Sequence, residues 1–360
     1  MPDWSALLTG AAPRFAYGGA VRTLPVFTYH DTGPDFVADL EYLRESGYRT
    51  VGAAEIEAAA RGDWRPDDHT VAITIDDGLA SVERVAVPAL ARHGFRAIVF
   101  VIAGLVPPTS AEGLMGWSEL RRAARAGVIE VGSHSLHHHY VPTSPRIVGW
   151  VTPDTAVEPY ARLPVPRLHG GRRPRLGEPI LYGRPRYATW RAYRPEPDAF
   201  DRCHALAAAA GPALFAAPGW RRALEQLARV QGTRESKDQG RSAILEDMRA
   251  SLEIVGRECP NPAARHLCYP WSAGGAEIDR LAAEAGAVAL YGNSWMRPRP
   301  VTTAAPAAVR RLSQDLVRRL PGRGRASFAA VLRRRVGRTM VPEGGWRNSF
   351  VGGARPDQRA

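Results

Sequence analysis

The sequence has few cysteines, almost no lysine and no long apolar run. Its three cysteines, Cys203, Cys259 and Cys268, are scattered, and no Cys-x-x-Cys pair occurs. This pattern excludes a disulfide framework and a cysteine-rich structural zinc site. No stretch of about 18 apolar residues is present, so the sequence predicts no transmembrane helix. The remaining composition, 45% hydrophobic and 23% charged, is that of a globular protein and excludes disorder along the whole chain.

Basic residues are abundant but unevenly placed. Of the 48 basic residues only Lys237 is a lysine, and the formal net charge is +12. Met1–Ser144 carries 12 arginines against 17 acidic residues, whereas Pro298–Ala360 carries 14 arginines against 3 acidic residues. We attribute this bias to a GC-rich genome and predict no nucleic-acid partner, because no recognition motif accompanies the charge.

The first residues and the basic C-terminal segment suggest where in the cell the protein is found. Met1–Trp4 lacks the basic and apolar segments of a signal peptide, so we expect a cytoplasmic protein. A basic helix is predicted at Arg325–Val336, with Phe328, Val331 and Leu332 as its apolar residues. Such a helix could also make weak contact with an anionic surface, which here would be the inner membrane.

Short apolar runs alternate with amphipathic, helix-like stretches through much of the chain. This alternation predicts parallel βαβ units, whose sites lie at the carboxyl ends of the strands. Seven strands fit a barrel better than an open sheet, although periodicity alone leaves both open. The predicted strands are Leu24–Tyr29, Tyr48–Val51, Val71–Ile75, Ala97–Ile102, Val128–Val131, His266–Tyr269 and Ala287–Tyr291.

One region interrupts the alternation. Residues 145–241 are rich in proline, arginine and glycine, with weak helical patterns only at Ala199–Ala210 and Trp220–Val230. A stretch of this length without clear strands is typical of an insertion. We therefore predict an N-terminal extension at 1–23, a barrel at 24–300 interrupted by the insertion 145–241, and a basic tail at 301–360 whose end is disordered.

Two polar clusters follow predicted strands directly. The first is Thr74–Gly78, which contains the adjacent carboxylates Asp76 and Asp77. A helix N-cap needs only one aspartate, so the second suggests another role. The second cluster is Gly132–His139, in which His134 and His138 are four residues apart. On a helical turn that spacing places two imidazoles on one face.

If the histidine cluster is considered by itself, an exposed polar loop would explain it equally well. Both clusters at strand ends favour a site, and two histidines with one aspartate leave water positions open on zinc or a similar ion.

Together these residues resemble the polysaccharide deacetylases of the NodB-homology group, carbohydrate esterase family 4. The first motif of that family, T-F-D-D-G, is matched by Thr74–Gly78 with Ile75 in place of phenylalanine. The second, H-[S/T]-x-x-H, is matched in full by His134–His138, and Phe27–Asp31 is similar to the Tyr-His strand that opens many members. The resemblance covers Leu24–His139 and Ser242–Tyr291.

The resemblance implies a distorted (β/α)7 barrel that hydrolyses an N-acyl group, most simply acetyl, on an amino sugar or glycan precursor. Asp76 matches the general base of the family. Asp77, His134 and His138 match the ligands of a divalent metal, which would be zinc or alternatively cobalt or nickel. Ser135 would orient the second motif through a hydrogen bond to the backbone.

The third motif of the family is only partly present. Tyr269, Pro270 and Trp271 fit a strand end and the wall of a substrate groove, and the Tyr269 backbone N–H would meet a tetrahedral oxyanion. In the family an arginine precedes a Pro-Tyr pair in this motif, and here that arginine is not at its usual place. Arg265 is close, but it lies at the amino end of the predicted strand His266–Tyr269, not at the strand end that carries the motif.

The fifth motif, L-x-H, which supplies the general acid, is absent because no histidine follows His266. Another group would have to protonate the leaving amine. His30, His137 and His139 are candidates, with Asp31 beside His30 as a further accessory residue, and the metal-bound network is an alternative.

Three classes of function remain to be compared. The leading hypothesis is a hydrolase of linear amide C–N bonds, with formyl or cyclic amides as variants. A barrel that binds carbohydrate or acts as a scaffold without turnover is the alternative, motivated by the missing arginine and histidine. Retention of Asp76 together with all three ligand positions favours the enzyme. A nucleic-acid binder rests on charge alone.

Overall fold

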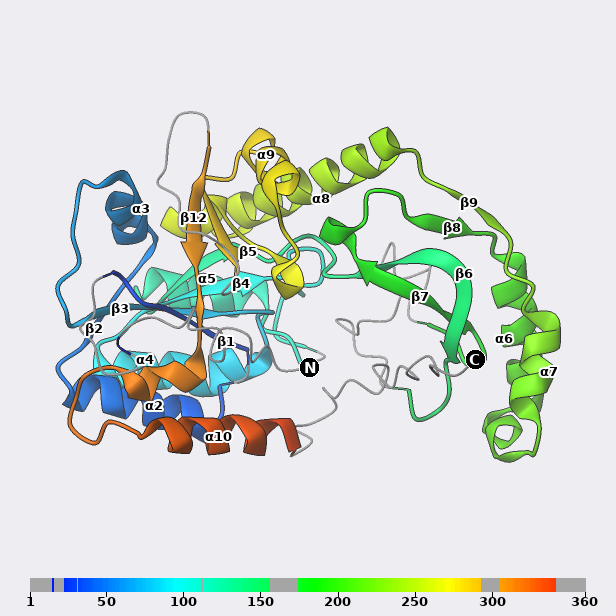
Figure 1. Cartoon of the computed structure of the whole chain (residues 1–360), viewed down its shortest axis with the longest axis horizontal. Coiled ribbons are helices and arrows are strands. Elements are labelled where there is room, and N and C mark those ends of the chain that lie inside the picture. Colours follow the sequence, from blue (N-terminus) through cyan, green and yellow to red (C-terminus); the bar gives the residue numbers. More distant parts are fainter. Residues whose placement is uncertain are drawn as a thin grey trace, which may run out of the picture. The chain divides into compact units, whose positions relative to one another are not determined.

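The computed structural model describes residues 15, 23–30, 32–111, 113–155, 174–292 and 305–340, with the backbone alone at 335–340. It contains two compact units (Figure 1). The barrel unit lies within residues 1–138 and 238–335, and the insert unit centres on residues 139–237. Each is described by itself. No helix of the described residues has the length and apolar content needed to cross a bilayer.

The barrel unit is built on one parallel sheet. Its strands follow in the order β12, β11, β10, β5, β4, β3, β1 and β13, and β2 pairs with β3 outside this path. Strands β3 and β4 are buried along their whole length, as expected of parallel strands covered on both faces. The bounds are β1 Val26–Tyr29, β2 Arg49–Val51, β3 Thr70–Ile75, β4 Ala97–Val101, β5 Ile129–Ser133, β10 His266–Cys268, β11 Ala289–Gly292, β12 Ala307–Arg310 and β13 Leu312–Ser313.

A single residue, Arg311, separates the strands at the two ends of this path. Arg310 of β12 pairs with Gly292 of β11, and Leu312 of β13 pairs with Phe27 of β1. The same chain segment therefore joins both edges of the sheet and closes it. With β12 and β13 counted as one, the ring has seven members, which confirms the predicted (β/α)7-type barrel. The predicted strand Tyr48–Val51 forms β2 and is not part of the ring.

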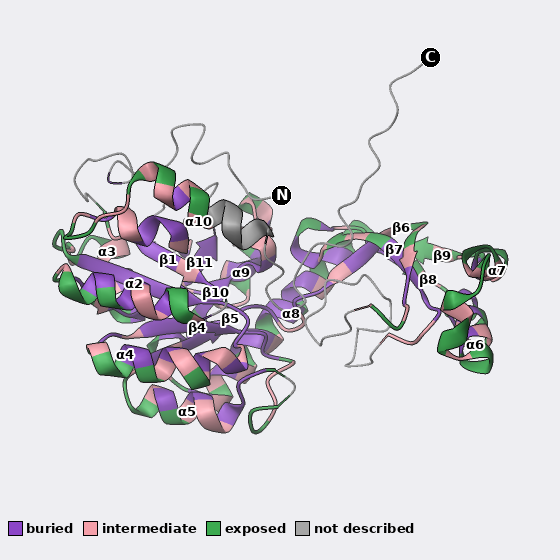
Figure 2. Ribbon diagram, turned by 90° about the horizontal axis from the view of Figure 1, so that it is seen from below, coloured by how far each residue is buried: buried purple, intermediate pink, exposed green. Residues whose placement is uncertain are grey.

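Helices cover the outside of the barrel. Figure 2 shows buried strands inside, and helices α2, α4 and α5 with exposed outer faces. Helix α4 ends at Gly94, whose φ of 67° is the left-handed conformation that glycine favours at a helix end. The helix bounds are α2 Pro34–Glu45, α3 Ala53–Arg61, α4 Val87–His93, α5 Trp117–Arg125, α8 Lys237–Glu258 and α9 Ala276–Glu284.

The interior of the barrel is packed rather than open. Phe100 on β4 and Tyr291 on β11 place their ring centres 4.7 Å apart. Gly132 on β5 is required for this packing, because a Cβ there would lie 2.6 Å from Cε1 of Phe100. The guanidinium carbon of Arg311 lies 5.9 Å from the centre of the Phe100 ring. The apolar interior therefore supports Arg311 from one side.

The predicted boundary at residue 300 is wrong, because the barrel unit continues to Arg335. It includes β12, β13, the 3-10 helix Gln314–Arg319 and the first part of helix α10 (Phe328–Met340). Val331 of α10 is buried in the main core, and Phe328 and Leu332 pack against it. Arg334 forms ion pairs with Asp35 and Asp39 of α2. The apolar side chains on which the membrane hypothesis rested are thus packed inside the barrel unit. The predicted disordered end falls within 341–360, outside the described residues.

The insert unit has two small antiparallel pairs. Strands β6 (Tyr140–Trp150) and β7 (Pro179–Pro185) pair, as do β8 (Tyr193–Pro195) and β9 (Gly232–Arg234). Helices α6 (Asp198–Ala210) and α7 (Trp220–Leu227) lie where weak helical patterns were predicted. The unit begins at 139 and ends at 237, compared with the predicted bounds of 145 and 241.

A buried carboxylate organises part of this unit. Glu235 accepts hydrogen bonds from Arg186 at 2.9 Å, from Arg194 at 3.0 Å and from the Ala192 backbone N–H at 3.1 Å. Burial alone would raise the pKa of Glu235, but the arginines hold it below the ordinary carboxyl value. The cluster thus ties Glu235, which follows β9, to β8 and to the segment before β8.

Candidate active site

The two aspartates lie directly beyond the buried strand β3. The Asp76 backbone N–H donates to the carbonyl of Tyr29 at the end of β1, which continues the sheet ladder by one residue. Asp77 then turns away with a φ of 70°. Both carboxylates are almost fully buried, at 1% and 3% exposure. Such burial is unusual for charged groups without partners, so each requires a compensating cation.

The two histidines lie beyond β5, on a turn rather than on the helical turn predicted from their spacing. Ser135 and His138 both have positive φ, at 72° and 45°, and these two reversals bring the imidazoles together. The ring centres of His134 and His138 are 4.8 Å apart. Ser135, which was predicted to orient this motif, accepts a hydrogen bond from the His138 backbone N–H at 2.9 Å.

Asp77, His134 and His138 each direct one ligand atom at a common point. Asp77 Oδ1 lies 3.6 Å from Nε2 of His134 and 3.6 Å from Nε2 of His138. This oxygen is buried and has no hydrogen-bond partner among the described residues. A divalent cation between the three groups would satisfy it, and one carboxylate with two imidazoles is a donor set suited to zinc. The residues therefore fit the metal that the sequence predicts.

The tautomer of His134 is fixed by its surroundings. Nδ1 lies 3.0 Å from the carbonyl oxygen of Cys268, which can only accept, so Nδ1 carries the proton and Nε2 keeps its lone pair. Burial lowers the pKa of His134 below its ordinary value, although Asp76 and Asp77 act in the opposite direction. The ring is consequently neutral at neutral pH, as a metal ligand must be.

Backbone strain is concentrated at this site. In the described part of the chain, five residues other than glycine have a positive φ, and all five follow β3, β5 or β10. Such conformations cost of order 1–3 kcal/mol each and tend to mark functional sites. The five are Asp77, Ser135, His138, Trp271 and Ser272.

Asp76 is paired with an arginine that sequence analysis missed. Arg311 donates from Nη1 to Oδ1 at 2.6 Å and from Nη2 to Oδ2 at 2.8 Å. Burial alone would raise the pKa of Asp76, but the Arg311 guanidinium, with smaller contributions from His134 and His30, holds it well below the ordinary carboxyl value. The Asp76 carboxylate is thus charged at neutral pH, and Arg311 supplies the cation absent from the expected position.

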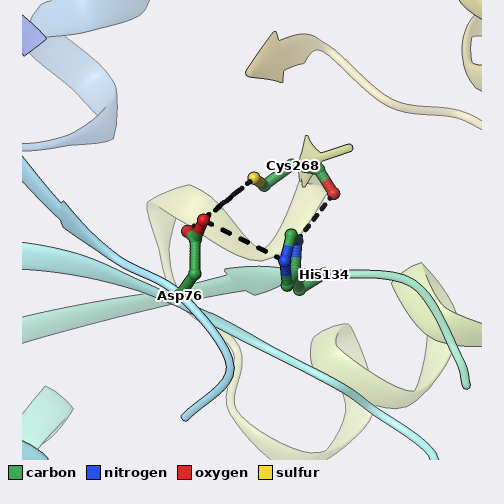
Figure 3. A group of neighbouring side chains, drawn as sticks. All are labelled: Asp76, His134 and Cys268. Atoms are coloured by element: carbon green, nitrogen blue, oxygen red, sulfur yellow. Dashed lines mark hydrogen bonds and ion pairs between the residues drawn. The ribbon is translucent and has the colours of Figure 1, made fainter. Parts of the chain in front are cut away.

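Cys268 completes the surroundings of Asp76. Its Sγ lies 3.7 Å and 3.8 Å from the two carboxylate oxygens (Figure 3). The side chain is fully buried, and burial raises the pKa of the thiol well above its ordinary value. The sequence analysis gave no sign of the contact of Cys268 with Asp76.

The accessory histidines differ in position. His30 Nε2 lies 3.6 Å from Oδ2 of Asp76, and 57% of its side chain is exposed, so it faces both Asp76 and solvent. His137 is partly exposed on the turn after β5. His139 is the first residue of the insert unit. Asp31 lies outside the described residues. Among the three histidines, which the structure describes, His30 has an ion-pair contact with Asp76.

The predicted oxyanion donor is wrong. The Tyr269 backbone N–H donates to the Tyr291 carbonyl at 3.0 Å, because the pairing of β10 with β11 extends one residue past Cys268. The Tyr269 side chain is buried and its hydroxyl donates to Asp279 at 2.7 Å. Pro270 is also buried. Trp271 does border the site, since its ring centre lies 4.2 Å from that of His138.

Arg311 escaped the sequence analysis because it follows a short run, Ala307–Val309, inside a segment assigned to a basic tail. The run is apolar and is followed at once by two arginines. A short strand with a charged residue at its carboxyl end is the pattern that could have identified Arg311 as a site residue. Composition concealed it, since arginine is common throughout this part of the chain.

Comparison with known proteins agrees with the motifs. Residues 64–153 match the family described as polysaccharide deacetylase. A Bacillus subtilis protein named as a polysaccharide deacetylase, YxkH, is 26% identical over 124 residues, which are 32% of this chain and 43% of that protein. The poly-β-1,6-N-acetyl-D-glucosamine N-deacetylase of Escherichia coli is 29% identical over 111 residues, 28% of this chain and 16% of that protein. The similarity thus spans less than half of either relative.

Solved structures share the fold. The BpsB deacetylase domain from Bordetella bronchiseptica gives a TM-score of 0.51 at 18% identity, over 81% of this chain and 96% of that one. A de-N-acetylase from Aggregatibacter actinomycetemcomitans gives 0.50 at 15% identity, over 80% and 94%. At these identities the likeness establishes the barrel architecture and nothing finer.

Proposed function

We propose that the chain is a polysaccharide deacetylase, in keeping with the family match over residues 64–153, and that it acts as a metal-dependent N-deacetylase of an amino-sugar polysaccharide or glycan precursor. The observation that carries this proposal is the adjacency of two sets of groups. Asp77, His134 and His138 offer three buried ligand atoms, and the charged carboxylate of Asp76 stands next to them, 4.0 Å from His134 Nε2. Hydrolysis of an amide needs both a Lewis acid and a base.

Zinc is the ion that we propose for Asp77, His134 and His138, with cobalt or nickel as substitutes. Such an ion, when bound, polarises the amide carbonyl and lowers the pKa of a coordinated water. The remaining chemistry belongs to side chains of this protein. Asp76 accepts a proton from the attacking water, and its two hydrogen bonds to Arg311 fix the orientation of the carboxylate.

We assign the proton donor to His30. Cleavage of the C–N bond leaves an amine that must gain a proton, and no histidine follows His266 to serve as the usual acid. His30 Nε2 lies 3.6 Å from Asp76 and is exposed to solvent, so it can reach the leaving nitrogen and be reprotonated after each turnover. Trp271 would form an apolar wall of the sugar site beside His138.

A specific observation also supports the alternative, a carbohydrate-binding barrel without turnover. The backbone N–H expected to stabilise the oxyanion is used within the sheet, and the usual acid motif is absent. A binding protein would not need the buried Asp76–Arg311 pair, however, and this pair weighs in favour of catalysis.

The decisive experiment is an acetate-release assay with the zinc-loaded protein. Poly-β-1,6-N-acetyl-D-glucosamine, the polymer in the name of the E. coli relative, is the first substrate to test, followed by chitin oligomers and N-formyl analogues. We expect release by the wild type and none by Asp76→Asn. Carbohydrate binding without release from any of these substrates would contradict the proposal and favour the binding protein.

A further inference from the structure

A second group of potential metal ligands overlaps the first. Asp76, His134 and Cys268 each present one ligand atom, and all three atoms lie within 4.8 Å of one another (Figure 3). Each residue is almost fully buried. This group differs from the first in one donor: a thiol sulfur takes the place of one imidazole nitrogen. Sulfur is the soft donor that thiophilic ions prefer.

The two groups compete for one atom. His134 Nδ1 is committed to the Cys268 carbonyl, so only Nε2 can bind a metal. That atom faces Asp77 at 3.6 Å and Asp76 at 4.0 Å. Nε2 has a single lone pair, so it can bind only one ion at a time. The two positions therefore cannot both be filled while each uses His134 as a ligand. The softness of the ion then decides between the two.

The charges around the second group can accommodate a dication. Arg311 fills one acceptor direction on each Asp76 oxygen, and a carboxylate has about four such directions, so others remain. The Cys268 sulfur lies 3.7–3.8 Å from both oxygens. On binding, a metal–sulfur bond replaces the S–H bond and the thiol proton leaves to solvent. Asp76, Asp77 and the Cys268 thiolate, with three negative charges, would then balance the three positive charges of Arg311 and the divalent ion.

We propose that Asp76, His134 and Cys268 form a second cation position, which takes a thiophilic divalent ion in competition with the position at Asp77, His134 and His138. An ion there occupies the carboxylate that we assign as the general base. This consequence, inhibition by soft metals, rests on the proposed function. The binding itself does not, so the two can be tested separately.

The test is a titration of metal-free, full-length protein with Cd²⁺, followed by the ultraviolet absorption of the sulfur–cadmium bond. We expect this band to saturate near one ion per chain in the wild type and in Cys259→Ser, a matched control for a buried cysteine in the same unit. In Cys268→Ser the band should be absent, with Cd²⁺ affinity lower by at least roughly 10-fold, since even outer-sphere partners are worth 10–100-fold. A band that persists without Cys268 would overturn the proposal.

Two further measurements do not depend on how Cys268→Ser folds. The ¹¹³Cd resonance of the wild type should lie in the range of sulfur-bound cadmium, and a shift typical of nitrogen and oxygen ligands alone would contradict the second position. His138→Ala removes a ligand of the first position only, so the sulfur band should remain in this variant. Its loss there would show that Cys268 does not act with Asp76 and His134. Neither readout involves catalysis, so failure of the proposed deacetylase activity leaves both interpretable.

Discussion

Arg311 binds both carboxylate oxygens of Asp76, at 2.6 Å and 2.8 Å, although 235 positions separate the two residues in the chain. Both side chains are buried, at 3% and 1% exposure. Since neither charge can be solvated by water, each depends on the other. Removal of one partner leaves an uncompensated charge, which costs far more than loss of an ion pair on the surface.

Arg311→Met should therefore destabilise the protein by about 3–5 kcal/mol, because it leaves Asp76 buried and unpaired. The double variant Arg311→Met with Asp76→Asn should recover part of this loss, since no charge then remains. Urea denaturation of both proteins is the measurement. Arg310→Met, at the neighbouring half-buried position, is the control. Equal losses at positions 310 and 311 would show that the ion pair does not determine the difference.

Metal content should follow the three proposed ligands. We expect about one zinc or similar ion per chain in untagged wild-type protein and little in Asp77→Ala or His134→Ala. Elemental analysis after dialysis measures this directly. His137→Ala, which alters a histidine on the same turn, is the control and should retain the ion. A wild type that binds neither zinc, cobalt nor nickel would rule out the metal centre.

His30→Ala should lower kcat for an N-acetyl sugar by roughly 10²–10⁴-fold, the usual contribution of a general acid, with little change in KM. The loss should be much smaller for an activated acetate ester, whose leaving group departs without protonation. Steady-state kinetics on the two substrates separates a proton donor from a residue that only packs. If both substrates lose activity equally, His30 does not donate the proton.

The stability contribution of Glu235 should depend on pH. The arginines hold its folded-state pKa below the value of about 4.3 in an unfolded chain. The contribution is therefore fully present above that value and is lost as the pH falls through the folded-state pKa. Glu235→Gln should be less stable than the wild type at pH 7, and the difference should shrink below about pH 4.

Urea denaturation at a series of pH values tests this expectation. The exposed Glu196 of the same unit provides the matched control, because Glu196→Gln should change little at any pH. A difference for Glu235→Gln that stays constant down to pH 3 would indicate that packing, and not charge, accounts for its effect.

The parts of this protein that sequence predicts well are those with strong local patterns. Strand β3 is a run of β-branched and apolar residues, and β5 begins with the alternating pattern Ile-Glu-Val. The polar residues that follow both strands must lie at the same edge of a parallel sheet. That reasoning alone brings Asp76, Asp77, His134 and His138 together. The family resemblance adds the roles of these residues, which spacing does not supply.

The parts that sequence misses depend on long-range closure. Strands β12 and β13 have four and two residues, too few for periodicity, and they are strands only because β11 and β1 stand on either side. Arg311 is buried for the same reason. Tyr269 failed as an oxyanion donor because the ladder with β11 extends one residue further, and such a boundary is not visible in a local pattern.

The position of Arg311 at the joint between β12 and β13 also affects how the chain matures on the ribosome. At roughly 5–20 residues per second, the 235 positions after Asp76 take on the order of 10–50 s to synthesise. Until then the nascent barrel has an open edge and a carboxylate whose cation has not yet been made. Every recognised motif is already present in a chain that stops short of β12, yet that chain cannot pair the Asp76 carboxylate with Arg311. The cation that stabilises buried Asp76 thus emerges only with the last two strands of the barrel, at the residue between them.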